Sequence, residues 1–264
     1  MEVFCIGNGL DGRITNNRAM MADADIFQPN FVRQLFDEMS QTYSVVNYIA
    51  SFGFTARWQK QCVRRIKVPL GATVYDLMTG MGEMCSDISR MIGSSGRIRA
   101  IDISPRMCAR ARQRLRHRIT CSVEVIEADI LDNGIDSGSA DVIVSSFGLK
   151  TFSEEQTVRL AREIHRILKP GGQFSLLEIS VPPSALLRIP YMFYLKYVVP
   201  VIGMLFMGNP ANYRLLGIYT EAFNDCSFIL RALEDTGLQV RSETYFFGCA
   251  TGVSGYKKQD LGAI

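Results

Sequence analysis

The chain has 264 residues, of which 47% are hydrophobic and 21% are charged, and this composition excludes a disordered or collagen-like protein. Seven cysteines without a CxxC pair and only two histidines indicate reduced thiols, a cytoplasmic compartment and no metal site. The net charge of +3 conceals an uneven distribution, because residues 57–118 hold 14 Lys and Arg against 4 Asp and Glu.

The first 30 residues show neither helical nor strand periodicity, and we expect a flexible arm here. Residues 7–12 spell GxGxxG. A dinucleotide-binding loop needs a strand before this motif and a helix after it. Because residues 13–17 have no apolar helical face, we favour a glycine-rich turn.

Residues 31–66 carry apolar side chains at spacings of three and four, which predicts helices, with a break at Gly53. We expect residues 31–68 to form amino-terminal substrate helices. They would belong to a single domain that spans residues 31–264.

From residue 73 onward, β-prone runs alternate with helical stretches. The predicted strands are 73–78, 97–101, 123–128, 140–145, 174–179, 238–247 and 251–256. The predicted helices are 84–92, 105–118, 154–168 and 224–236. This alternation predicts an α/β fold with a mostly parallel sheet and crossover helices.

Residues 181–219 interrupt the alternation with an aromatic, proline-containing insert, for which we expect the role of a lid. Its apolar run 189–207 contains Lys196, Pro200 and Gly203, so we expect an interfacial segment and not a membrane-spanning helix. The aromatic side chains suit a hydrophobic substrate, although a dimer interface or ordinary core would have the same composition.

A glycine turn follows the first predicted strand. Asp76 lies in that strand, and Gly80 and Gly82 let the backbone turn tightly and approach a ligand. Asp102 ends the second strand, where a carboxylate can accept hydrogen bonds from ribose hydroxyls, and Asp129 ends the third, where it could bind an adenine amino group. The alternative is that these acids cap helices or turns.

The residue after the second glycine is Glu83, which is unfavourable beside a pyrophosphate but compatible with a cationic cofactor. No GxxxxGK[ST] motif is present. These features favour S-adenosylmethionine, whose sulfonium is positive and whose amino-acid end could meet Asp76 and the glycine backbone.

Several motifs over residues 36–256 resemble class I S-adenosylmethionine methyltransferases, and specifically the ubiquinone/menaquinone biosynthesis C-methyltransferase (UbiE-type) family. The more specific are the amino-terminal block, with Phe36-Asp37 and Ser51-Phe52-Gly53, and Ser146-Phe147-Gly148-Leu149, and Asp102-Ile103-Ser104-Pro105 follows in family order. The resemblance implies a Rossmann-like, seven-stranded sheet with amino-terminal helices and a helical lid. It also implies cofactor contacts from Met81, Asp102, Ile103, Asp129, Ile130 and Ser146.

The chain departs from the family pattern at two places. Met78, Thr79, Met81 and Glu83 intrude at the glycine turn, and the family's Ser-Phe-Gly-Leu-Arg-Asn ends here in Lys150-Thr151. A change from Arg to Lys removes a planar, bidentate hydrogen-bonding group. This departure bears on the quinone substrate more than on methyl transfer.

Methylation at carbon requires loss of a proton, and the candidate catalytic groups are Tyr43, Lys150 and Glu178. Glu178 could equally be a structural hydrogen-bond acceptor. The expected substrate-binding residues are Asn47, Trp58, Tyr194 and Tyr219.

These features predict a cytoplasmic S-adenosylmethionine-dependent C-methyltransferase that acts on a hydrophobic, isoprenoid-like or quinone-like small molecule. The alternatives are methylation of a short prenyl diphosphate alkene, a phospholipid N-methyltransferase, a secondary-metabolite methyltransferase and a non-methylating cyclase. We do not expect a nucleic-acid partner. The basic block and the insert leave contact with an anionic membrane and a homodimer open.

Overall fold

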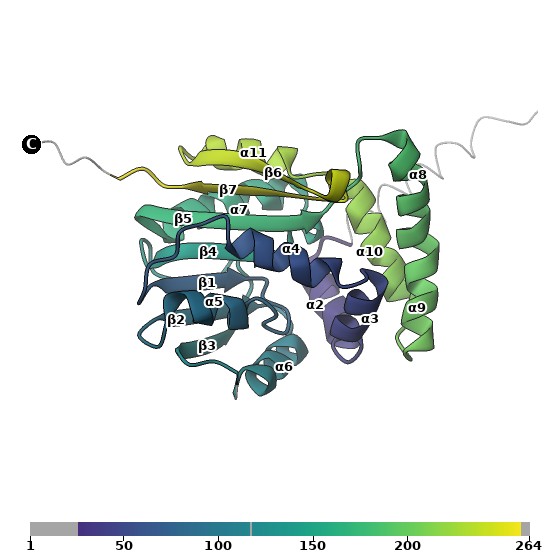
Figure 1. Ribbon diagram of the computed structural model, residues 1–264, viewed down its shortest axis with the longest axis horizontal. Coiled ribbons are helices and arrows are strands. Elements are labelled where there is room, and N and C mark those ends of the chain that lie inside the picture. Colours follow the sequence, from purple (N-terminus) through teal and green to yellow (C-terminus); the bar gives the residue numbers. More distant parts are fainter. Residues whose placement is uncertain (1–25, 117, 260–264) are drawn as a thin grey trace, which may run out of the picture.

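The computed structural model describes residues 26–116 and 118–259, so the glycine motif at residues 7–12 and most of the expected arm lie outside it. Seven strands form one sheet in the order β3-β2-β1-β4-β5-β7-β6 (Figure 1). Their bounds are β1 Thr73–Leu77, β2 Arg97–Asp102, β3 Ser122–Glu127, β4 Ala140–Ser146, β5 Leu168–Ile179, β6 Gln239–Tyr245 and β7 Ala250–Tyr256. Strand β7 runs antiparallel to both of its neighbours, β5 and β6, and the other four strand pairs are parallel. The expected mostly parallel sheet is confirmed.

Helices cover both faces of the sheet because alternate strand residues point to opposite sides. In β1, Val74 packs into the core beside α5 (Cys85–Ile92) and α6 (Pro105–Leu115). Tyr75 and Leu77 pack into the opposite core beside α7 (Glu154–Ile167) and α11 (Ser227–Glu234).

Strand β5 begins at Leu168, six residues earlier than expected. Leu168 pairs with Ala140 of β4, and the register then shifts before Val142. The Leu-Lys-Pro-Gly-Gly segment is therefore part of the strand and not only a turn after α7. A local sequence pattern does not reveal this pairing because it depends on contact with β4.

The amino-terminal helices and the lid pack on one another at one end of the sheet (Figure 1). The amino-terminal helices are α2 Pro29–Met39, α3 Tyr43–Ala50 and α4 Phe54–Val63. The lid contains α8 Ala185–Phe193, the π-helical η2 Tyr194–Val198, α9 Val199–Leu205 and the first part of α10 Pro210–Phe223. Two short 3-10 turns, η1 Leu149–Thr151 and η3 Phe246–Gly248, follow β4 and β6.

The segment Ala185–Leu205 forms one continuous helix of 21 residues that is long and apolar enough to cross a membrane by length and composition. Its two prolines do not end the helix, since Pro190 lies within α8 and the wide turn of η2 precedes Pro200 at the start of α9. Length and composition alone are weak evidence for a membrane span, since helices of soluble proteins also meet them.

Candidate active site

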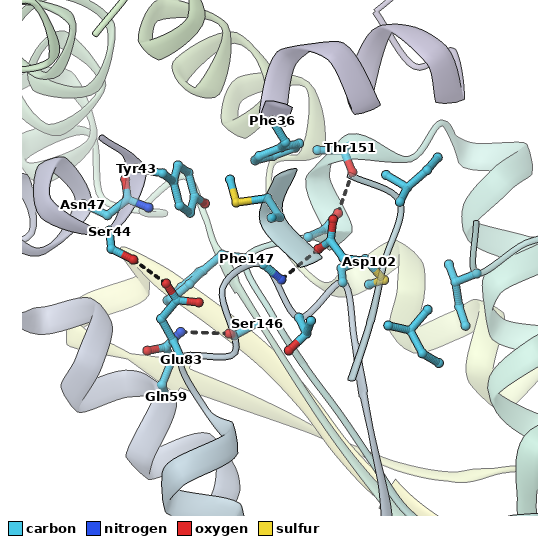
Figure 2. Close-up of a pocket in the computed structure, with 18 of the residues that line it drawn as sticks. Phe36, Tyr43, Ser44, Asn47, Gln59, Glu83, Asp102, Ser146, Phe147 and Thr151 are labelled. Carbon is cyan, nitrogen blue, oxygen red and sulfur yellow. Dashed lines mark hydrogen bonds between the residues drawn. The ribbon is translucent and has the colours of Figure 1, made fainter. Parts of the chain in front are cut away.

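A cavity of about 430 Å³, named the polar cavity for its acidic and hydroxyl side chains, lies at the carboxyl ends of β1, β2, β3 and β4, and residues of α2 and α3 also line it (Figure 2). Its wall contains Gly80, Asp102, Ile103, Asp129, Ile130 and Ser146. These expected cofactor residues come from four separate strand ends. The parallel sheet brings them together because the carboxyl ends of its strands share one edge.

The glycine turn adopts the left-handed conformation that glycine allows, with φ of 58° at Gly80 and 71° at Gly82. A Cβ atom on Gly82 would lie 3.0 Å from Cδ1 of Leu115 on α6, so close packing as well as the turn requires glycine here. Gly80 faces the polar cavity, whereas Gly82 and Met81 lie outside the walls of both cavities described here. Their expected cofactor contacts stay predictions.

Asp102 links the glycine turn to the end of β2. Its Oδ2 accepts a hydrogen bond from Gly80 N at 2.7 Å, and its Oδ1 accepts one from Ser104 N at 2.9 Å. Burial raises the pKa of the Asp102 carboxyl to about 6. Each oxygen keeps a free lone pair, so the carboxylate could still accept bonds from a ligand hydroxyl.

Asp76 lies directly beneath the turn and lines neither cavity. Its Oδ2 accepts a hydrogen bond from Thr79 Oγ1 at 2.6 Å, and its Oδ1 has no partner among the described residues. Burial raises the pKa of this carboxyl to about 7. Asp76 therefore acts on the site through the turn and its own negative charge, and the expected direct contact is not supported.

The amino-terminal helices reach the sheet through polar contacts that sequence reasoning missed. Ser44 Oγ donates to Glu83, and Gln59 Nε2 donates to Ser146 Oγ at 3.0 Å (Figure 2). Asp37 accepts a bond from Arg106 N at 3.1 Å and so helps to cap α6 from a distant helix. No short-range pattern signals these pairs, because their members are far apart in the chain.

A second, apolar cavity of about 350 Å³ lies between the amino-terminal helices and the lid. Its wall contains the expected residues Trp58, Tyr194 and Lys150, together with Leu187 and Tyr191 of α8. The two cavities share four wall residues, which are Tyr43, Asn47, Thr55 and Phe147. A ligand in the polar cavity and a ligand in the apolar cavity would meet at these residues.

Tyr43 stands at this junction, edge-on to Phe36 at a ring distance of 5.7 Å. Burial raises the pKa of its phenol further above the usual value. Tyr43 is therefore a hydrogen-bond donor near neutral pH, and its expected role as a base is disfavoured.

Lys150 and Glu178 form a buried ion pair beside the junction, with Nζ and Oε1 2.8 Å apart. Lys150 Nζ also donates to the carbonyl oxygen of Phe147 at 2.8 Å, which leaves one of its three N–H groups available. Glu178 additionally accepts bonds from the backbone N–H groups of Lys150 and Ile179. Because Glu178 is fully buried, occupied and outside both cavity walls, the structure supports the alternative that it is a structural acceptor.

Tyr219 lines neither cavity, so nothing in the structure supports its expected substrate contact, which stays a prediction. It is fully buried, donates to the carbonyl oxygen of Ile26 and packs edge-on against Phe27 at 5.7 Å. Tyr194 does line the apolar cavity, and its hydroxyl donates to Ala50 O at 2.8 Å. Of the two tyrosines expected to bind substrate, only Tyr194 therefore lines the apolar cavity.

The family model described as the ubiE/COQ5 methyltransferase family matches residues 23–257. The chain belongs to this family. It is therefore an S-adenosylmethionine-dependent methyltransferase, as the motifs predicted.

Relatives within the ubiE/COQ5 family match nearly the whole chain. The ubiquinone/menaquinone biosynthesis C-methyltransferase UbiE of Enterobacter sp. (strain 638) is 29% identical, covering 94% of this chain and 98% of that protein. The UbiE of Escherichia fergusonii is 30% identical over 80% of this chain and 83% of its own length. The demethylmenaquinone methyltransferase of Listeria welshimeri is 26% identical over 87% and 97%.

Solved structures share the fold. A SAM-dependent methyltransferase from Aquifex aeolicus superposes with a TM-score of 0.52 at 21% identity, over 75% of this chain and 88% of that chain. The [4+2]-cyclase SpnF superposes with a TM-score of 0.58 at 16% identity, over 87% and 96%. At these identities the likeness concerns the fold only.

The polar cavity fits the cofactor of the ubiE/COQ5 family. Asp102, Asp129 and Glu83 line it, and Arg114 lies 3.6 Å from Glu83. The wall also contains Lys60, Arg90, Arg114 and Arg118, so its charge is mixed. Asp102 has no salt-bridge partner among the described residues, so a cationic group beside Asp102 would stabilise its carboxylate.

Proposed function

We propose that this enzyme transfers a methyl group to a ring carbon of a prenylated quinol. The observation that carries the proposal is the junction of Tyr43, Asn47, Thr55 and Phe147, where the polar cofactor cavity meets an apolar cavity. The printed names of the relatives, which concern ubiquinone and menaquinone biosynthesis, support the same substrate class.

In this proposal the polar cavity holds the cofactor. The backbone of Gly80 contacts the cofactor. Asp102 accepts hydrogen bonds from the ribose hydroxyls, and Asp129 accepts one from the adenine amino group. The side chains of Ile103 and Ile130 pack on the adenine ring. Ser146 lies at the end of β4 on the same wall. When bound, S-adenosylmethionine supplies an electrophilic methyl group on a positively charged sulfur. Asp76, Met81 and Gly82 support the turn.

The residues at the junction would orient and polarise the quinol. Tyr43 donates a hydrogen bond, and the remaining N–H of Lys150 can hold a ring oxygen whose negative charge activates the neighbouring carbon. The hydroxyl proton of that oxygen goes to solvent as the quinol binds. After the methyl group moves from sulfur to the ring carbon, the hydrogen on that carbon leaves as a proton, the oxygen is protonated again, and the aromatic quinol is restored. Glu178 keeps the Lys150 ammonium in place. Asn47, Trp58 and Tyr194 enclose the ring and the start of the prenyl chain in a site that excludes water.

The apolar cavity favours a quinol over the other acceptors considered. Lys150 is the single cationic side chain in its described wall, which suits one ring oxygen better than a diphosphate. We further propose that residues 31–264 act as one domain, with the lid closing the apolar cavity, and that the enzyme works in the cytoplasm.

The decisive experiment measures transfer of labelled methyl from S-adenosylmethionine to quinols of increasing prenyl length, prenyl diphosphates, phospholipids and simple phenols. We expect product only with quinols and increasing kcat/KM with prenyl length, with the methyl group on a ring carbon by mass spectrometry. Turnover of diphosphates or phospholipids alone would overturn the proposal. Product formed without loss of label from the cofactor would indicate a cyclase.

Replacing Tyr43 with Phe tests the junction, because this change removes only the hydroxyl. We expect kcat on the preferred quinol to fall about 100-fold, as for loss of one polarising donor, while cofactor affinity stays within about twofold. The matched control is Tyr256→Phe on β7, which is exposed and outside both cavity walls. Equal kcat values for the two variants would exclude Tyr43 from the reaction.

A further inference from the structure

The outward face of the lid helix carries a continuous apolar stripe. Its members recur every three or four residues along α8 to α9, the spacing of one helix face. They are Leu186, Ile189, Phe193, Tyr197, Val201, Met204 and Leu205, all at least half exposed. The inward face of the same helix, with Leu187, Tyr191 and Tyr194, lines the apolar cavity. The helix is therefore apolar on both sides.

Exposed aromatic side chains from other segments lie near this stripe. Phe52 stacks on Tyr194 at 6.5 Å, and Phe246 of η3 packs on Phe54 at 4.8 Å. Phe52 and Phe246 also line the apolar cavity while they are 81% and 49% exposed, so they mark its mouth.

The backbone is strained at four exposed apolar residues near the stripe. Phe52, Met207, Phe246 and Phe247 all have positive φ values, of 50°, 61°, 40° and 55°, although bulky side chains disfavour this region. All four side chains are exposed. Strained residues cluster at functional sites, and each of these four strained positions carries a large, exposed apolar side chain.

The lid carries an excess of basic charge. Residues 179–220 contain Arg188, Lys196 and Arg214 and no Asp or Glu, and Lys196 pairs with Glu221 of α10. Arg188 on α8, Arg214 on α10 and Arg57 on the neighbouring α4 are exposed and have no salt-bridge partner among the described residues. An apolar face with basic residues around it is complementary to an anionic lipid surface.

We propose that this docking face, made of the outward side of α8 to α9 with Phe52, Met207, Phe246 and Phe247, seats the enzyme on an anionic membrane. The helix lies along the interface and does not cross it, because Val199, Pro200 and Gly203 are buried against the protein. The mouth of the apolar cavity opens at this face, so a prenylated substrate enters from the lipid without crossing water. The entry step rests on the proposed function, whereas the docking does not.

The test is flotation of the full chain with unilamellar vesicles of phosphatidylcholine, with or without phosphatidylglycerol. We expect strong binding to the anionic vesicles that weakens with added salt. The double variant Leu186→Glu, Phe193→Glu should bind at least about tenfold more weakly, since two apolar contacts are lost. The matched control is Leu70→Glu. Leu70 is 80% exposed in the turn before β1, at the end of that strand opposite to the cavities, so this variant should bind the vesicles as the wild type does.

Thermal melting and cofactor affinity of the double variant should match those of the wild type, and so should its methyl transfer to a water-soluble, short-chain quinol. Its activity on a long-chain quinol in vesicles should fall. Equal flotation of wild type and double variant, or no flotation of the wild type, would overturn the docking. A dimer that the double variant dissociates, without any change in flotation, would assign the face to a second copy instead.

Failure of the docking can be distinguished from failure of the proposed function. Flotation needs no substrate, so it decides the membrane contact by itself. If no quinol of any chain length accepts a methyl group, the proposed substrate is wrong and the docking result still holds.

Discussion

Two buried carboxylates beneath the glycine turn lack any cationic side chain within salt-bridge distance among the described residues. Asp76 and Asp102 both have a pKa raised by burial, to about 7 and about 6. An isolated buried carboxylate is costly to ionise, and a cationic ligand offsets that cost. At the level of single residues, a positively charged ligand would stabilise the ionised form of Asp102 in the cavity wall, whereas Asp76 lines neither cavity and acts through the turn.

Asp102→Asn should weaken binding of S-adenosylmethionine by about 1 to 3 kcal/mol, because a charged acceptor is lost from the polar cavity. Wild-type affinity should also fall as the pH drops below about 6, where a proton neutralises the carboxylate. Calorimetric titrations between pH 5 and 8 measure both effects, with the exposed Asp235→Asn as the control. A variant with unchanged affinity would remove Asp102 from the cofactor site.

Asp76→Asn should change how stability depends on pH. The folded pKa of Asp76 lies above its ordinary value of 3.8, so between about pH 4 and 7 the folded state binds more protons than the unfolded state. The Asp76 contribution to the free energy of unfolding therefore falls as the pH rises through this window.

Urea denaturation of the cofactor-free protein at pH 5.5 and pH 8 tests this prediction. Relative to the wild type, Asp76→Asn should gain stability on going to pH 8, by up to about 4 kcal/mol over the full window. A constant difference between the two proteins at both pH values would show that the carboxylate stays ionised throughout.

At the level of elements, polar contacts join the amino-terminal helices to the sheet and to the lid. Thr42, at the start of α3, shares a hydrogen bond of 2.8 Å with the hydroxyl of Tyr213 on α10. The Tyr213 ring packs directly on Gly203 of α9, where a Cβ atom would lie 2.3 Å from Cδ2 of the ring. Close contact between α9 and α10 therefore positions one wall of the apolar cavity.

Gly203→Ala should displace the Tyr213 ring and destabilise the protein by about 1 to 3 kcal/mol, as overpacking does. The KM for the quinol should rise while cofactor affinity stays the same, because α10 lines only the apolar cavity. Chemical denaturation and steady-state kinetics measure these changes. The control is Met204→Ala, because Met204 is the next residue and its side chain is exposed. If both variants lost the same stability and showed the same rise in KM, the contact between Gly203 and the Tyr213 ring would not be the cause.

At the level of the whole molecule, one sheet edge and two helical segments assemble two adjoining cavities. The sheet supplies the polar cavity at the point where β1 lies between β2 and β4, the place where open α/β sheets bind ligands. The apolar cavity forms only when residues near position 50 meet residues near position 195. Trp58, the single tryptophan of the chain, lines the apolar cavity and not the polar one.

Trp58 should therefore report which cavity a ligand occupies. A quinone bound in the apolar cavity should quench its fluorescence to saturation, whereas a cofactor analogue in the polar cavity should change the emission little. Titrations of the wild type measure this, and Trp58→Phe should lose the signal. Strong quenching by the cofactor analogue alone would contradict the separation of the two cavities.

The sequence determined the features that depend on local geometry. Alternation of strands and helices predicted the sheet, and strand ends predicted that Gly80, Asp102 and Asp129 share one cavity wall. Periodicity and strand ends record which way neighbouring residues point, and this suffices for a parallel sheet.

Tertiary structure alone decided the pairings between distant residues. It paired Lys150 with Glu178, buried Tyr219 outside both cavity walls against Ile26, and placed Asp37 at the start of a helix in another part of the chain. It also kept the lid helix continuous through two prolines and joined the two cavities at Tyr43. These outcomes depend on how whole elements pack, so residues near one another in the sequence carry no local signal of them.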